Sequence, residues 1–60
     1  MVFPTIEKGD RVYHMQCGYG VGYVVNADKW DEIARVKWPD VDWPWGHESW
    51  EYFSDLMLIS

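Results

Sequence analysis

Apolar and polar residues alternate along short stretches of this chain, which predicts β-strands rather than helices. The stretch 33–38 shows the alternation most clearly, because every second residue is apolar and would point toward a core. The inward set is Ala34, Val36 and Trp38, and the outward set is Ile33, Arg35 and Lys37. No window repeats apolar residues at helical spacing over several turns. We therefore expect an all-β fold.

Four further strands follow from the same pattern, at residues 11–15, 22–26, 47–53 and 56–59. Val12 and His14 share one face of the first of these strands, and Val24 points inward from the second. Residues 53–55 are expected to form a short helical turn before the closing strand.

The strand at 47–53 separates rings from polar groups. Trp50 and Tyr52 lie on one face, whereas Ser49 and Glu51 lie on the other. This alternation is typical of a strand with one face in a core.

Turn residues separate the expected strands. The glycine cluster at 18–22 marks a tight, twisted hairpin, because glycine reaches positive φ without steric cost. The segment 26–32 is polar, as in a solvated hairpin loop, and Trp30 is out of character there. Five short strands with such turns predict one domain, residues 1–60, folded as a small five-stranded SH3-like (Tudor-like) barrel. Closure would remove the exposed edges of a short open sheet.

Aromatic residues exceed what so short a chain can bury. The 60 residues include five Trp, four Tyr and two Phe, and each buried ring removes roughly 150–250 Å² from water. Some rings must therefore lie on the surface. This surplus is the main functional signal in the sequence.

Charge is distributed unevenly. The net charge is −5, and every Lys and Arg lies at or before Lys37, so the remaining residues to the C-terminus carry only acids. Such a surface repels phosphate, which counts against nucleic-acid or anionic-membrane binding and favours a basic partner. Arg11, Arg35 and Lys37 offer a small basic strip, which keeps nucleic-acid binding open as an alternative.

No apolar run is long enough for a transmembrane helix, and no signal-peptide pattern opens the chain. The single cysteine, Cys17, excludes an internal disulfide and fits a reducing compartment. We expect a cytoplasmic protein, or a virion component if the chain is an assembly subunit.

Two motifs resemble a known family. Gly-Asp-Arg-Val-x-His at 9–14 and Gly-Val-Gly-x-Val-Val at 20–25 resemble the start of bacterial Tudor-like or SH3-like domains. These include the C-terminal domain of large DNA-repair helicases and the RNA-polymerase-interacting domain of CarD-like transcription factors. Arg-Val-Lys-Trp at 35–38 and Leu-x-Leu-Ile at 56–59 are also similar. The matching positions are Gly9, Asp10, Val12, His14, Gly20, Gly22, Val24, Val36 and Leu56.

The resemblance implies a protein-binding barrel that docks on RNA polymerase, in its relatives mostly through an exposed strand edge. The chain departs from the family at Tyr19, where a phenylalanine is usual, and in the Trp43-Pro44-Trp45 loop, which has no counterpart.

The candidate partner-binding residues are Trp43, Trp45, Asp40, Asp42 and Trp30. Tryptophans beside a proline form rigid aromatic anchors of the kind that become interface hot spots. The alternative is that Trp43 and Trp45 fold back to cap a small core.

A second candidate is an aromatic cage for a methylated Lys or Arg, formed by Tyr19, Tyr23, Trp38, Trp50 and Tyr52. Ring faces attract a cation, and nearby carboxylates would add to that attraction. Cross-strand aromatic packing is the simpler interpretation of the same residues.

The sequence gives little support for a metal site or for a catalytic site. His14, Cys17 and His47 supply too few ligands for a structural zinc site, which needs four. No arrangement of nucleophile, base and orienting group is visible, and the glycine cluster lacks the residues of a phosphate-binding loop. We expect no metal, no cofactor and no enzymatic activity.

Three functions remain open. The first is a non-enzymatic protein-interaction module whose partner carries basic and apolar groups, with transcription machinery as the class that the resemblance implies. The second is a small structural subunit of a larger, phage-like assembly, for which self-association is expected. The third is a Tudor-type methylated-residue or nucleic-acid reader.

Overall fold

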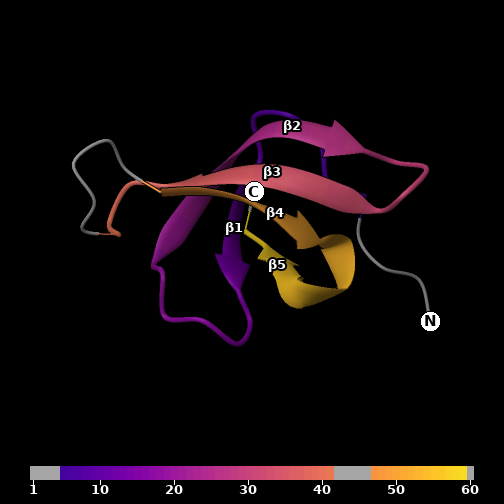
Figure 1. The fold of residues 1–60 in the computed structure, drawn as a ribbon. Helices are drawn as coiled ribbons and strands as arrows, with labels where there is room; N and C mark the ends of the chain where they lie inside the picture. Colours follow the sequence, from indigo (N-terminus) through magenta and orange to yellow (C-terminus); the bar gives the residue numbers. More distant parts are fainter. Residues whose placement is uncertain (1–4, 42–46, 60) are drawn as a thin grey trace.

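The computed structural model describes residues 5–41 and 47–59. Five antiparallel strands form one sheet in the order β4-β3-β2-β1-β5 (Figure 1). The elements are β1 (Arg11–His14), β2 (Val21–Asp28), β3 (Ile33–Trp38), β4 (His47–Tyr52), the 3₁₀-helix η1 (Phe53–Asp55) and β5 (Leu56–Leu58). The all-β prediction is confirmed. No helix in the described ranges is long and apolar enough to cross a membrane.

The sheet is open, so the expected closure into a barrel is not seen. β4 and β5 form its two edges. β5 has only three residues, and it pairs with β1 along its whole length. The 3₁₀-helix η1 separates β4 from β5 in the chain. Because β5 is so short, it offers few backbone N–H and C=O groups for pairing with β4 in addition to β1.

The second strand is longer than the sequence predicts. The sequence predicts that this strand ends at Asn26 and that Ala27 and Asp28 lie in a solvated loop, but both residues pair with β3. The pairing register shifts between Val24 and Asn26, which is the signature of a β-bulge. The bulge adds twist and leaves the polar side chain of Asn26 exposed, so a polar segment is compatible with a strand there.

The core lies inside the curl of the sheet. Its buried side chains are Ile6, Val12, Val24, Ala34, Val36, Trp38, Phe53 and Leu56. The predicted inward positions of β1, β2 and β3 are therefore confirmed. Gly22 is buried opposite Val12, and a Cβ atom there would lie 2.5 Å from the Trp38 ring. This close approach explains why a glycine is needed at that position.

β4 reverses the usual distribution of side chains. Its rings point outward, with Trp50 and Tyr52 52% and 63% exposed. The polar residues Ser49 and Glu51 lie opposite the buried Val36 and Ala34, on the side of the core. Neighbouring strands thus place apolar and polar side chains on the same inner face.

Candidate functional site

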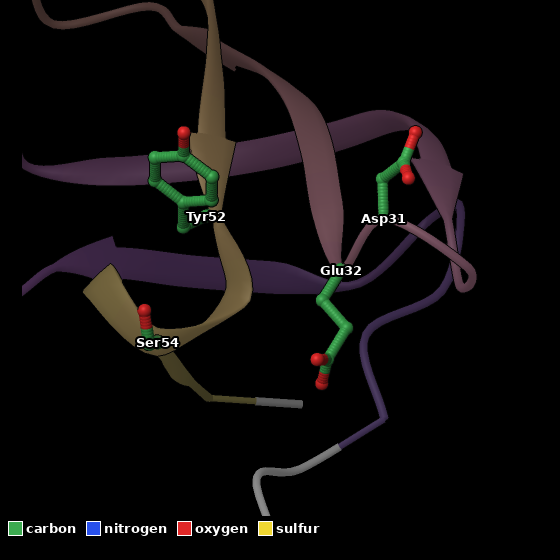
Figure 2. Close-up of a pocket in the computed structure, with 4 residues that line it drawn as sticks. All are labelled: Asp31, Glu32, Tyr52 and Ser54. Carbon is green, nitrogen blue, oxygen red and sulfur yellow. The ribbon is translucent and has the colours of Figure 1, made fainter.

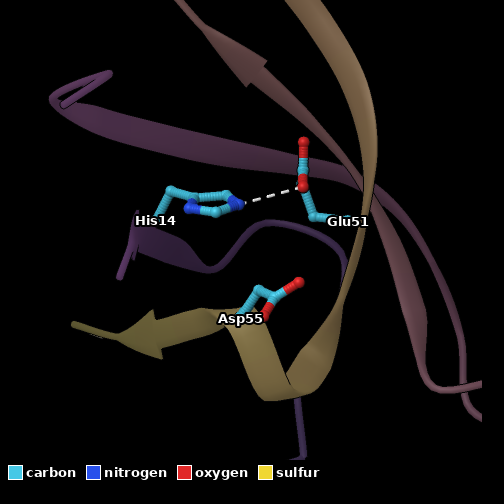
Figure 3. A group of neighbouring side chains, drawn as sticks. All are labelled: His14, Glu51 and Asp55. Carbon is cyan, nitrogen blue, oxygen red and sulfur yellow. Dashed lines mark hydrogen bonds and ion pairs between the residues drawn. The ribbon is translucent and has the colours of Figure 1, made fainter. Parts of the chain in front are cut away.

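A chain of hydrogen bonds crosses the inner face of the sheet. The indole Nε1 of Trp38 donates to Ser49 Oγ at 3.0 Å, and that hydroxyl donates to Glu51 Oε2 at 2.5 Å. The other carboxylate oxygen, Oε1, lies 3.0 Å from Nε2 of His14 (Figure 3). The His14 and Glu51 side chains are only 6% and 18% exposed. We call these four residues the inner clasp.

The backbone fixes the proton of the imidazole. The amide N–H groups of Gln16 and Cys17 both donate to His14 Nδ1, each at 3.1 Å. A nitrogen that accepts two hydrogen bonds carries no proton, so the proton of the ring lies on Nε2. His14 therefore donates to the Glu51 carboxylate as a neutral ring, and every polar atom of the inner clasp has a partner.

The inner clasp joins strands that are not neighbours. His14 lies on β1 and Glu51 on β4, and β2 and β3 separate them in the sheet. Their hydrogen bond can form only because the sheet curls. The amide of Met15 also donates to the carbonyl of Asp55 at 2.9 Å, which ties the end of β1 to η1. The inner clasp and this backbone bond thus connect β1 with β4 and with η1 across the curved sheet.

The inner clasp has the wrong order for nucleophilic catalysis. An activated serine requires a base that takes its proton, with a third group that orients the base. Here Ser49 donates to the carboxylate and accepts from the Trp38 indole, and the imidazole bonds to the carboxylate rather than to the hydroxyl. Its chemistry is that of a structural network.

His14, Glu51 and Asp55 also place their ligand atoms within 4.8 Å of one another, which is the spacing of a metal site. A metal on Nε2 of a neutral imidazole requires the proton on Nδ1. Two amide N–H groups donate to Nδ1, so Nδ1 carries no proton and the ring proton occupies Nε2. This geometry therefore disfavours a metal bound to Nε2. The trio His14, Cys17 and His47 forms no such group in the described part of the chain.

Tyr19 packs beside the inner clasp. Its ring centroid lies 5.8 Å from that of His14 and 5.2 Å from that of Trp38. A side-chain hydrogen bond with Cys17 is the largest cause that raises the pKa of the Tyr19 hydroxyl above 10.0. The charge of Cys17, burial and the charge of Glu51 raise this pKa further.

The outer face combines rings with cations in two adjacent rows. One row runs across four strands and contains Arg11, Tyr23, Lys37 and Glu48. The next row contains Asn26, Arg35 and Trp50. Arg35 Nε forms an ion pair with Glu48 Oε1 at 2.9 Å, and the two side chains are 50% and 39% exposed. All of these residues face solvent.

The turn between β2 and β3 presents the most exposed ring that the structure describes. Trp30 is 95% exposed. Asp28 Oδ1 accepts from the amides of Trp30 and Asp31 at 2.9 and 3.2 Å, which holds the turn in shape. Glu32 has a φ of 53°, and its carbonyl accepts from the amide of Phe53 at 2.7 Å.

A shallow hollow of about 120 Å³ opens beside this turn, lined by Asp31, Glu32, Tyr52 and Ser54. In Figure 2, Glu32 and Asp31 extend in different directions from the turn, while Tyr52 and Ser54 come from the end of β4 and from η1. We call the hollow and Trp30 together the turn site.

The structure divides the candidate cage residues between two faces. Trp38 is fully buried, and Tyr19 packs against the core beside it. Tyr23, Trp50 and Tyr52 are exposed on the outer face. The five rings therefore do not surround one site. The alternation of β4 separates Trp50 and Tyr52 from the interior, where Trp38 lies.

The candidate partner-binding residues are also separated. Trp43, Trp45 and Asp42 lie outside the described residues. Asp40 is exposed beyond the end of β3, beside Gly20, where a Cβ atom would lie 2.8 Å from its Oδ2. Trp30 precedes the start of β3, so a six-residue strand, about 20 Å long, separates the two.

The sequence did not single out the inner clasp. Ser49 and Glu51 were placed on one face of their strand, opposite the rings, but nothing local indicates which face turns inward. The alternation of β4 is the relevant signal, together with the indole Nε1 of Trp38, which needs an acceptor when the ring is buried.

Comparison with known proteins adds no identification: no family model, curated protein or solved structure matches this chain.

Proposed function

We propose that this protein is a non-enzymatic interaction module that binds a protein partner through the turn site. The observation that carries the proposal is the 95% exposure of Trp30 on a turn held by hydrogen bonds. Tryptophan is enriched among interface residues that dominate binding energy. A rigid turn also loses little conformational freedom when it binds, which favours affinity.

The hollow supports a partner with basic and apolar groups. Its volume of about 120 Å³ is far below the roughly 300–1,000 Å³ of small-molecule pockets, so it suits one side chain. Asp31 and Glu32 supply negative charge, and the exposed ring of Tyr52 can attract a cation. A Lys or Arg side chain in the hollow, with an apolar group against Trp30, would match this chemistry.

The resemblance of the glycine-rich hairpin to CarD-like and Tudor-like domains supports transcription machinery as the class of partner. It also supports an SH3-like description of the sheet, with which the strand order β4-β3-β2-β1-β5 is compatible. Fold-level likeness alone does not assign a function, so the partner must be tested directly.

The test uses the full chain with a photoreactive amino acid in place of Lys29, next to Trp30. We expect irradiation in a bacterial lysate to crosslink a specific protein, and Trp30→Ala in the same chain to abolish that crosslink. Trp50→Ala, the same substitution on the outer face, should leave the crosslink intact. A crosslink that persists in Trp30→Ala, or none at all, overturns the proposal.

Purified bacterial RNA polymerase tests the class of partner separately. We expect surface-immobilised protein to capture the polymerase, and Trp30→Ala to weaken capture at least tenfold, as loss of a hot-spot residue does. If a specific crosslink forms but the polymerase is not captured, the partner lies outside transcription.

A further inference from the structure

The outer face carries a second surface with the opposite charge. We define the basic aromatic patch as Arg11, Tyr23, Arg35, Lys37 and Trp50. We propose that this patch binds single-stranded nucleic acid, with bases stacked on Tyr23 and Trp50 and phosphates beside the three cations. The proposal goes beyond the protein-binding function above, because it concerns different residues and a different class of ligand.

Charge segregation is the first argument. The two rows of the outer face contain three cations and one carboxylate, Glu48, for a local charge of +3 − 1 = +2. The whole chain has a net charge of −5. Three of the five basic residues of the protein therefore share one face. The overall acidity that argues against phosphate binding does not describe this surface at about 0.1–0.15 M salt, because charges beyond about 8–10 Å are then largely screened.

The arrangement of rings is the second argument. Register places Tyr23 directly between Arg11 and Lys37, and places Trp50 next to Arg35. Tyr23 and Trp50 are 47% and 52% exposed, so each offers a ring surface to a ligand. Surfaces that bind single strands combine aromatic platforms for bases with cations that follow the phosphates.

The rings distinguish a single strand from other acidic ligands. Bases in a duplex are already stacked on one another, so exposed rings on a sheet gain nothing from them. An acidic protein segment would use the cations but has no planar groups that require two separate aromatic platforms. Arg35 is already paired with Glu48, whereas Lys37 makes no ion pair in the described ranges, so Lys37 is the cation most available to a phosphate.

The test measures fluorescence anisotropy of a labelled oligothymidylate of about 12 nucleotides, titrated with the full chain in a series that starts at about 0.1 M salt. We expect binding that weakens with salt, with a slope of log K against log salt near −2, as expected for about three phosphate contacts on a single strand. Trp50→Ala should weaken binding about five- to a hundredfold through lost stacking. Lys37→Gln should make this negative slope shallower by less than one unit, because one phosphate contact is lost.

Trp30→Ala is the matched control, because it is the same substitution of a still more exposed tryptophan in an acidic turn. We expect this variant to bind the oligonucleotide like the wild type. Circular dichroism spectra establish whether Trp50→Ala is folded, and Lys37→Gln changes an exposed side chain and so serves as a second test if it is not.

Three results would overturn the proposal: no binding at about 0.1 M salt, equal loss in Trp30→Ala and Trp50→Ala, or equal competition by polyglutamate and by unlabelled oligothymidylate. The last result would show a surface for acidic protein segments instead. The crosslink at the turn and the binding of the oligonucleotide are independent, so either can fail while the other stands.

Discussion

β3 and β4 are adjacent strands of equal length, but β3 turns its apolar side chains inward and β4 turns its aromatic side chains outward. β3 buries Ala34, Val36 and Trp38 and exposes Arg35 and Lys37, as a half-buried strand normally does. Facing it, β4 exposes large rings and turns polar groups toward the core. The difference shows that alternation identifies two faces of a strand, whereas hydropathy alone does not decide which face lies inside.

Hydrogen bonding explains why this reversal is stable. Ser49 and Glu51 are partly buried, and a polar group shielded from water is costly only when it lacks a partner. Ser49 and Glu51 take part in three hydrogen bonds. One joins the two side chains, and the other two come from Trp38 on β3 and His14 on β1. The polar face of β4 thus connects the apolar strand to the far side of the sheet. Its rings remain outside, where they are available for binding.

The largest expected effect comes from breaking the packing of β3 against β2. In Gly22→Ala, the new Cβ would lie 2.5 Å from atoms of both Trp38 and Val36, so the core must shift. We expect a loss of about 3 kcal/mol in the free energy of unfolding, measured by urea denaturation. Gly18→Ala is the control, because a Cβ there meets nothing within 4 Å. Equal stability of the two variants would contradict the packing.

The next effect comes from breaking the inner clasp on β4. Glu51→Ala removes the acceptor of His14 Nε2 and of the Ser49 hydroxyl, and we expect it to cost about 2 kcal/mol in urea unfolding. Glu51→Gln keeps one acceptor oxygen and should cost less. The control is Glu48→Ala on the outer face of the same strand, which removes an exposed ion pair worth about 0.2–1 kcal/mol. A larger loss of stability in Glu48→Ala than in Glu51→Ala would show that the face of β4 that carries Glu51 is not the inner one.

The smallest effect concerns Tyr19, which lies beside the inner clasp. Because its folded-state pKa is raised, the folded protein holds the phenol proton more tightly than the unfolded chain does. The resulting stability is fully present below the unfolded pKa of about 10 and is lost as pH rises through the folded pKa. We expect urea midpoints to fall above about pH 10, and Tyr19→Phe to reduce that fall. An unchanged alkaline profile in Tyr19→Phe would exclude this contribution.

Much of the fold could be predicted, because the local alternation of apolar and polar residues indicates where strands lie and which positions face inward. The bounds of β3 and η1 and the inward positions Val12, Val24 and Val36 follow from residue patterns alone. The bulge that extends β2 and the open edge at β5 could not be predicted, because both depend on which strands pair and in what register.

The candidate sites were harder to predict than the strands. Exposure of Trp30 agrees with its unexpected place in a polar segment. Arg11, Tyr23 and Lys37 lie side by side because β1, β2 and β3 pair in this register. The sequence alone therefore indicates the basic strip but not the rings beside it. The inner clasp depends on contact across the curl of the sheet, between residues 37 positions apart. The alternation of β4 separates Ser49 and Glu51 from the rings, but it does not indicate that Glu51 contacts β1.

Acrylamide quenching of tryptophan fluorescence tests the opposite orientations of Trp38 and Trp50 most directly, because acrylamide is uncharged and reports access alone. Trp38 is fully buried and Trp50 is 52% exposed. We therefore predict that Trp38→Phe removes protected emission and that Trp50→Phe removes strongly quenched emission. If Trp50→Phe instead removes protected emission, β4 is displaced by one residue, its rings lie in the core, and the outer surface described above does not exist.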